Sequence, residues 1–154
     1  MIEFIPLKLL LSLSMKYYLV KTDPDTYSID NLVHDKVTTW DGVNNAQAVI
    51  FLKQMHPKDM VLVYHSQGQC TIVGLAEVVG NSRPDLKNPR SWLVDFKFIK
   101  RFDEPYVTLQ DIKATGKFQN FRLVTQSRLS VMPVPENVIE YLKKKGLPIP
   151  SSRT

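Results

Sequence analysis

WLVDFKFI, at residues 92–99, is the clearest β-strand signal in the chain. Large apolar side chains occupy the even positions from Trp92 to Phe98, and Asp95 and Lys97 fall between them. Because successive side chains of a strand point to opposite faces, this period of two predicts a strand with one buried face.

Further strands and helices are predicted on both sides of this segment. Runs rich in apolar and β-branched residues predict strands at 17–22, 37–40, 60–65, 70–79 and 128–134, with a possible bulge at Gly74. Capping residues and apolar spacing predict helices at 28–33, 45–55, from Thr108 onward, and at 136–145. Residues 80–91, which contain Gly, Asn, Ser, Asp and two Pro, predict a loop.

The helix at 45–55 carries the strongest local signals. Asn44 has N-cap chemistry, and Gln47 stands three residues later. A stripe at i, i+3, i+4 and i+7 predicts the face that packs on the core, and it consists of Ala48, Phe51, Leu52 and Met55.

Short strands with few helices predict an α+β fold: an open or closed mixed β-barrel with short helices at its flanks. The length of 154 residues suits one domain. Residues 1–14 form an apolar extension that is too short to span a bilayer, and Glu3 stands where a signal peptide is basic. We expect the extension to lie outside the fold, with a domain at 15–146 and a C-terminal tail at 147–154.

The charge distribution favours a polyanionic partner. The net charge is +5, and residues 97–154 hold 11 basic side chains against 5 acidic ones. Phosphate contacts come mostly from Lys and Arg, so this half suits nucleic acid, although an ordinary solvated surface is an equal alternative.

No catalytic constellation is evident. The three histidines, His34, His56 and His65, have no partners at metal-ligand spacing, so neither a metal nor a cofactor is expected. Cys70 lies five residues after His65, which makes a Cys–His nucleophile conceivable, but a lone cysteine that opens an apolar strand is more often buried. We therefore expect a protein that is not an enzyme.

Three clusters suit base recognition. Trp40 is followed by a sharp turn and two amides, Asn44 and Asn45, and an aromatic face beside amides can stack on a base and bond to its edge. The others are His65-Ser66 at a strand end and the pair Arg128 and Ser130, expected on one face of a strand. Each cluster also has a purely structural interpretation. Trp40 would belong to the core, and Asn44 would be only a helix cap. His65 and Ser66 would lie at a solvated hairpin end, and Arg128 would pair with Asp41 or Asp95.

Several blocks, taken in order, resemble the EVE domain family of PUA-like β-barrels. They are KYYLVKTDPDTYSIDNL, WDGVNNAQA, YHS, GLAEVV, NPRSWLVDFKF and SRLSVMPV, which together extend from residue 15 to about residue 143. The resemblance implies a barrel with a pocket that recognises a modified base in DNA or RNA.

The resemblance also implies roles for particular residues. Trp40 would be the pocket aromatic, Lys21 and Thr22 would line the pocket or its mouth, His65 and Ser66 would add polar contacts, and Arg128 and Ser130 would flank the opening. Many family members have an Arg after the position of Val43 and an aromatic two residues later, where this chain has Asn44 and Ala46.

We therefore expect a monomeric reader of a modified base, with DNA or RNA as partner and no membrane association. It would be cytoplasmic in a bacterium, nuclear in a eukaryote, and not secreted. Two alternatives remain open. One is an enzyme of the ASCH-like type that hydrolyses an amide or modifies a nucleotide through Lys21, Thr22 or Cys70, and the other is a protein-interaction module.

Overall fold

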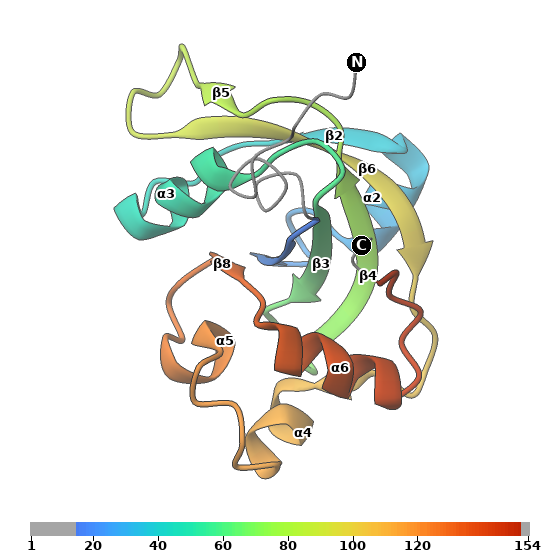
Figure 1. Cartoon of the computed structure of the whole chain (residues 1–154). Coiled ribbons are helices and arrows are strands. Elements are labelled where there is room, and N and C mark those ends of the chain that lie inside the picture. Colours follow the sequence, from blue (N-terminus) through green and yellow to red (C-terminus); the bar gives the residue numbers. More distant parts are fainter. Residues whose placement is uncertain (1–14, 152–154) are drawn as a thin grey trace, which may run out of the picture.

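The computed structural model describes residues 15–151, which form one curled, mixed β-sheet with short helices around it (Figure 1). The main strands are β1 (Tyr17–Thr22), β2 (Val37–Trp40), β3 (Met60–His65), β4 (Thr71–Val78), β6 (Trp92–Arg101) and β8 (Val131–Pro133). Their order across the sheet is β2-β6-β4-β3-β1-β8. Two short strands, β5 (Arg83–Pro84) and β7 (Val107–Thr108), pair with β6 and β4.

The sheet is mixed because β1 and β3 are parallel, whereas its other pairs are antiparallel. β1, β3 and β4 are buried along most of their length, as strands covered on both faces are. The sheet is open between its edge strands β2 and β8, so it forms a half-barrel. The α+β, barrel-like class predicted from the sequence is confirmed.

Bulges bend the sheet into this shape. The register of β3 with β4 shifts after Val63, which pairs with Gly74, so Val73 has no partner across the ladder. A second shift, between β4 and β6, follows Leu75. An extra residue bends a strand and increases its twist. The bulge predicted at Gly74 is confirmed, and a Cβ atom there would lie 3.0 Å from the Lys100 carbonyl oxygen.

The described residues form five helices: α2 (Ile29–Asp35), α3 (Ala46–Gln54), α4 (Leu109–Ala114), α5 (Arg122–Thr125) and α6 (Glu136–Lys144). In Figure 1, α3 lies near β5 and β8, while α4, α5 and α6 gather at the other end of the sheet. The predicted caps Ser28 and Thr108 both form capping boxes. The predicted stripe of α3 is buried at all four positions. No helix in residues 15–151 is long and apolar enough to span a membrane.

Three predictions of local structure are wrong. The cap of α3 is Asn45 and not Asn44, because the Asn45 side chain accepts a hydrogen bond from the Ala48 amide at 3.0 Å. The last strand is Val131–Pro133, not 128–134, because α5 and a turn from Gln126 to Leu129 occupy the preceding residues. Residues 80–91 are not all loop, since β5 pairs there with the start of β6.

Candidate base-binding cavity

A cavity of ≈ 560 Å³ opens where β1 and β2 end and β8 begins. Three segments far apart in the chain form its walls. They supply Lys21, Thr22, Asp23, Thr26 and Tyr27 from the end of β1, residues 38–44 from β2 and the turn after it, and Ser130. Of the residues predicted for the site, Lys21, Thr22, Trp40, Asn44 and Ser130 are thus brought together.

Trp40 is held in place by two other aromatic rings. Its ring lies 5.4 Å from that of the buried Phe96, at an interplanar angle of 38°. Tyr27 meets it edge-on, with ring centroids 6.0 Å apart, and the Tyr27 hydroxyl donates to Asp35 at 2.8 Å. Trp40 itself is partly exposed, so the ring is both part of the core's edge and available to the cavity.

The opposite wall is built on β1. The Lys21 ammonium donates a 2.8 Å hydrogen bond to the Ser127 carbonyl, and the Lys21 amide donates to the Ser130 carbonyl. Burial lowers the pKa of Lys21, and the neighbouring Cys70 opposes this effect. The Thr22 hydroxyl donates to the Tyr27 carbonyl at 2.7 Å. Two of the three side chains named for an enzymatic alternative, Lys21 and Thr22, are therefore already engaged with the backbone.

The cavity holds two carboxylates, Asp23 and Asp41, which were not among the site residues predicted from the sequence. Asp23 accepts a hydrogen bond from the Asp25 amide at 2.9 Å, as in an Asx turn. Asp41 is exposed and, among residues 15–151, has no hydrogen-bond or ion-pair partner. Asp41 adjoins Trp40 in the sequence, so proximity to the aromatic could have pointed to it. No local pattern in the sequence indicated that Tyr27 would line the cavity.

Two shallower hollows flank the cavity, and each presents arginine. One, of ≈ 350 Å³, is lined by Asn45, Arg128 and neighbours on α3 and the 125–129 turn. The other, of ≈ 500 Å³, lies on α3 and includes Asn44, Lys53 and Arg90. Asn45 and Arg128 are thus beside the cavity and not in its lining. Arg128 pairs with neither Asp41 nor Asp95, because Asp95 binds Arg83 and Thr39.

Arg128 and Ser130 do not share a strand face. Both precede β8, and Arg128 lies in the turn after α5. Ser130 reaches the cavity because its carbonyl is bonded to β1, whereas Arg128 points to the neighbouring hollow. The alternation expected from a strand therefore does not apply here.

His65 and Ser66, both predicted for the site, do not line the cavity. The His65 Nε2 atom accepts a hydrogen bond from the Ile29 amide at 3.0 Å, at the start of α2. Burial lowers the pKa of His65, with a smaller opposing effect of Asp30 and a further lowering by Arg101. The Ser66 amide donates to the Thr22 carbonyl. These two residues support the end of β1, which itself lines the cavity.

The thiol of Cys70 donates to the Ser66 carbonyl at 3.5 Å, and Cys70 does not line the cavity. In the part of the chain that the structure describes, no group of three or more His, Cys, Asp or Glu residues could hold a metal ion.

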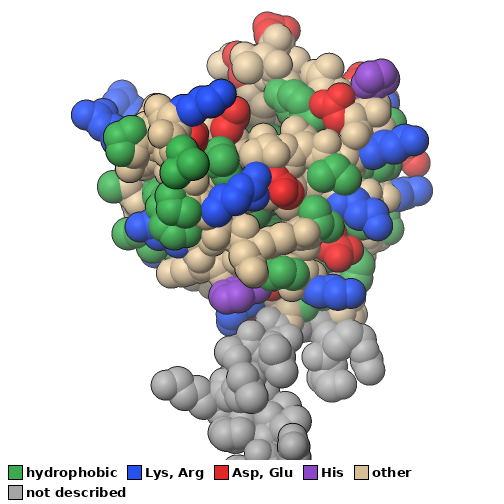
Figure 2. All heavy atoms as spheres, turned by 90° about the horizontal axis from the view of Figure 1, so that it is seen from above, with side chains coloured by type: hydrophobic (Ala, Val, Ile, Leu, Met, Phe, Trp, Pro, Cys, Tyr) green, Lys and Arg blue, Asp and Glu red, His purple; other side chains and the backbone are tan. Residues whose placement is uncertain are grey.

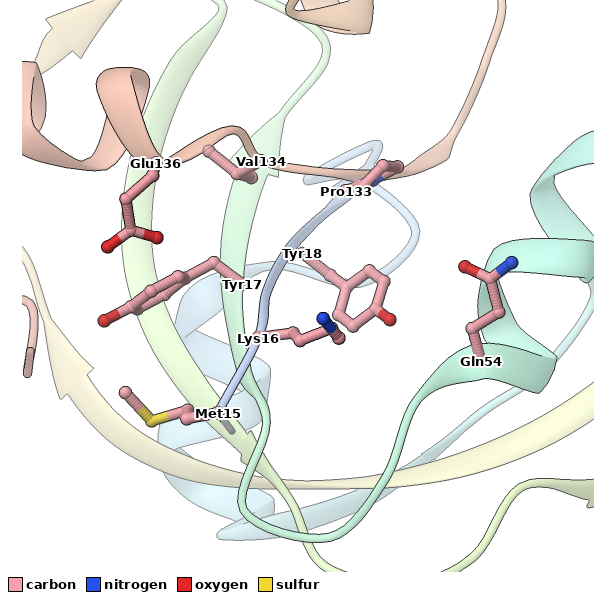
Figure 3. A pocket seen from close by; sticks show the side chains of 8 residues that line it. All are labelled: Met15, Lys16, Tyr17, Tyr18, Gln54, Pro133, Val134 and Glu136. Carbon is pink, nitrogen blue, oxygen red and sulfur yellow. The ribbon is translucent and has the colours of Figure 1, made fainter. Parts of the chain in front are cut away.

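Another hollow, of ≈ 530 Å³, lies at the start of β1 and contains none of the predicted site residues (Figure 3). Tyr17 and Tyr18 point to its two sides, and Glu136 and Gln54 lie across it from each other. The Tyr17 hydroxyl donates to the Pro150 carbonyl at 2.6 Å. Gln54 and Glu136 therefore do not converge on one point of this hollow.

Several known proteins resemble this chain in sequence and in overall fold. Thymocyte nuclear protein 1 of Rattus norvegicus is 34% identical over 161 residues, which cover 82% of this chain and 71% of the rat protein. A hypothetical protein from Leishmania major superposes with a TM-score of 0.78 at 34% identity, covering 85% of this chain and 94% of the other.

Another similar structure contains DNA. Human THYN1 protein in complex with 5-methylcytosine containing DNA has a TM-score of 0.76 at 25% identity, covering 88% of this chain and 99% of the human one. The family model described as EVE domain matches residues 16–145. On this match and on the ordered blocks that first suggested it, the chain belongs to the EVE domain family.

Proposed function

We propose that this protein binds nucleic acid and holds one unstacked, modified base in the cavity beside Trp40. The observation that carries the proposal is the composition of the cavity, which combines an indole face with carboxylates and has its one ammonium group engaged. Its volume of ≈ 560 Å³ also lies in the usual range for small-ligand sites, about 300–1,000 Å³.

The charges support a base, and not a phosphate, as the group inside the cavity. Asp23 and Asp41 would repel a phosphate, but carboxylates accept hydrogen bonds from exocyclic amino groups such as that of cytosine. The arginines lie outside, in the flanking hollows, where they suit the backbone of the same strand. Charge is therefore arranged as a nucleotide requires, with acceptors around the base and cations around the phosphates.

The similarity to a human protein that was crystallised with 5-methylcytosine containing DNA makes 5-methylcytosine the first modified base to test. A stack on Trp40 is worth about 1–3 kcal/mol, comparable with the few kcal/mol needed to extrude a base from a duplex. Phosphate contacts must supply the rest of the affinity. A single strand is therefore expected to bind more tightly than a duplex of the same sequence.

The test is fluorescence polarisation with labelled single strands that differ only in one central base: 5-methylcytosine, cytosine or thymine. Trp40→Ala should abolish the preference for 5-methylcytosine, and Trp40→Phe, which keeps an aromatic face, should retain part of it. Thermal unfolding of both variants shows whether they remain folded. An unchanged preference in a folded Trp40→Ala protein would remove Trp40 from the proposed site.

A further inference from the structure

The hollow on α3 extends the cavity along the surface of the molecule. It has a volume of ≈ 500 Å³ and is lined by Asn44, Ala46, Val49, Ile50, Lys53 and Arg90, which we call the α3 groove. Asn44 also lines the base cavity, so the two hollows meet at that residue.

The α3 groove has an apolar floor between two cations. Ile50 is 51% exposed although it lies on a helix that packs against the sheet. Lys53 and Arg90 supply positive charge, and none of the six lining residues is acidic. Figure 2 shows hydrophobic side chains with Lys and Arg around them on the left of the face seen from above, the side where α3 and β5 lie in Figure 1. This composition is the reverse of that of the cavity, which contains carboxylates.

Local contacts position the loop that carries Arg90 and the side chain of Lys53. The Asn88 side chain donates to the Asn44 amide oxygen at 2.7 Å and accepts from the Arg90 amide at 3.1 Å, so it ties the loop that carries Arg90 to the rim of the cavity. The Lys53 ammonium lies over the Trp92 ring, 5.0 Å from its centroid. Among residues 15–151, the Arg90 guanidinium has no hydrogen-bond or ion-pair partner and is available to an anion.

We infer that the α3 groove binds the nucleotide next to the base in the cavity, with its phosphate at Arg90 and Lys53 and its sugar or base on Ile50. The inference rests on the proposed function, because it requires that a base occupies the cavity. Two observations favour a nucleic acid strand over another anionic partner: the groove meets the cavity at Asn44, and its cations adjoin an apolar surface as the phosphate and base of one nucleotide do.

The test uses the full chain and four probes: the nucleoside 5-methyldeoxycytidine, the two dinucleotides that extend it on the 5′ or the 3′ side, and a short single strand with one central 5-methylcytosine. Binding is measured by calorimetry or polarisation for the wild type, Arg90→Ala and Lys53→Ala. Lys113→Ala, an exposed lysine on α4 at the other end of the sheet, is the matched control.

One of the two dinucleotides should bind the wild type more tightly than the nucleoside does. Arg90→Ala and Lys53→Ala should lose that gain, about three- to tenfold, and reduce the slope of log K against log salt by about 0.7 for each lost contact on the single strand. Nucleoside binding should stay unchanged in both variants, and Lys113→Ala should match the wild type throughout.

The two failures are distinguishable. If the wild type binds nucleoside and strand, but neither extension tightens binding or the gain persists in Arg90→Ala and Lys53→Ala, the α3 groove is overturned and the base cavity stands. If the wild type binds neither nucleoside nor strand, the proposed function is overturned and the groove with it.

Discussion

At the scale of single residues, Asp41 is a negative charge whose position in the cavity suggests a role in binding. The chain is basic, yet this exposed carboxylate lines the cavity beside Trp40 and has no partner among the described residues. A carboxylate can only accept hydrogen bonds, so it suits a ligand edge that donates them. We expect Asp41 to select bases that carry an exocyclic amino group.

Asp41→Asn should therefore reduce the discrimination between 5-methylcytosine and thymine strands by about 1–2 kcal/mol, because the amide retains an acceptor but loses the charge. The measurement is competition of the two strands in polarisation. Asp25→Asn serves as control, since Asp25 is exposed and does not line the cavity. Equal effects of the two substitutions would indicate a general change in surface charge.

We expect His65 to contribute to stability through its contact with α2. The Nε2 atom of His65 accepts a hydrogen bond from the Ile29 amide, so the folded state favours the neutral ring. Burial lowers the pKa of His65 below the ordinary value of 6.5. An unfolded chain then takes up the proton first as the pH falls. The stabilisation is complete above about pH 6.5 and is lost as the pH falls toward the lowered pKa of the folded state.

Replacing the ring tests this linkage. His65→Gln, whose amide can still accept from Ile29, should lose less stability than the wild type between about pH 6.5 and 5, as measured by urea unfolding at several pH values. His56→Gln, which changes an exposed ring, should follow the wild type. Parallel curves for the wild type and His65→Gln would contradict the assignment.

At the scale of elements, two consecutive asparagines at the start of α3 have different roles. Asn45 caps the helix by accepting from the Ala48 amide, while Asn44 turns outward and accepts from Asn88. The sequence pointed to Asn44 as the cap because Gln47 follows it at the capping-box distance. A one-residue shift of the cap places Asn44 on the rim of the cavity, where its amide is exposed to a ligand.

Asn45→Ala should destabilise the protein by about 1 kcal/mol, the usual loss for a helix cap. Asn44→Ala should change the free energy of unfolding by less than about 0.5 kcal/mol, as substitutions on the surface do. Guanidinium unfolding of the two variants side by side gives the comparison. If Asn44→Ala costs as much as Asn45→Ala, the division of roles between these residues is wrong.

At the scale of the whole molecule, the segment after α6 is joined to the first strand. Leu147 and Ile149 are each 7% exposed, and the Pro150 carbonyl accepts from the Tyr17 hydroxyl. Leu147 and Ile149, within the tail predicted at 147–154, therefore carry core contacts, and the position of the domain boundary remains a prediction. Apolar side chains this deeply buried contribute to the stability of the entire sheet.

Leu147→Ala is expected to cost about 2–5 kcal/mol in the free energy of unfolding, the range for large-to-small substitutions in a core. Leu86→Ala makes the same chemical change at a side chain that is 97% exposed, and its effect should stay within about 0.5 kcal/mol. Thermal and urea unfolding of both proteins test the contrast. Equal, small effects would show that the segment after α6 does not support the fold.

Local signals in the sequence determined most of the elements. Period-2 alternation predicted β6, and apolar runs predicted β1 and β3 with their observed bounds. Ser28 and Thr108 predicted the starts of α2 and α4, because a cap depends only on the next three residues. α5 was missed because its N-cap, Phe121, makes no side-chain hydrogen bond.

Only the tertiary structure decided which of the candidate residues meet. Lys21, Trp40 and Ser130 come together because β1 pairs with β3 and β8 while the bulged strands curl β2 toward them, and these pairings join segments distant in the chain. His65 was assigned to the cavity by its place at a strand end, yet its ring bonds the start of α2. Alternation and capping act over a few residues, whereas a cavity depends on long-range pairing and strand bending, which no local pattern encodes.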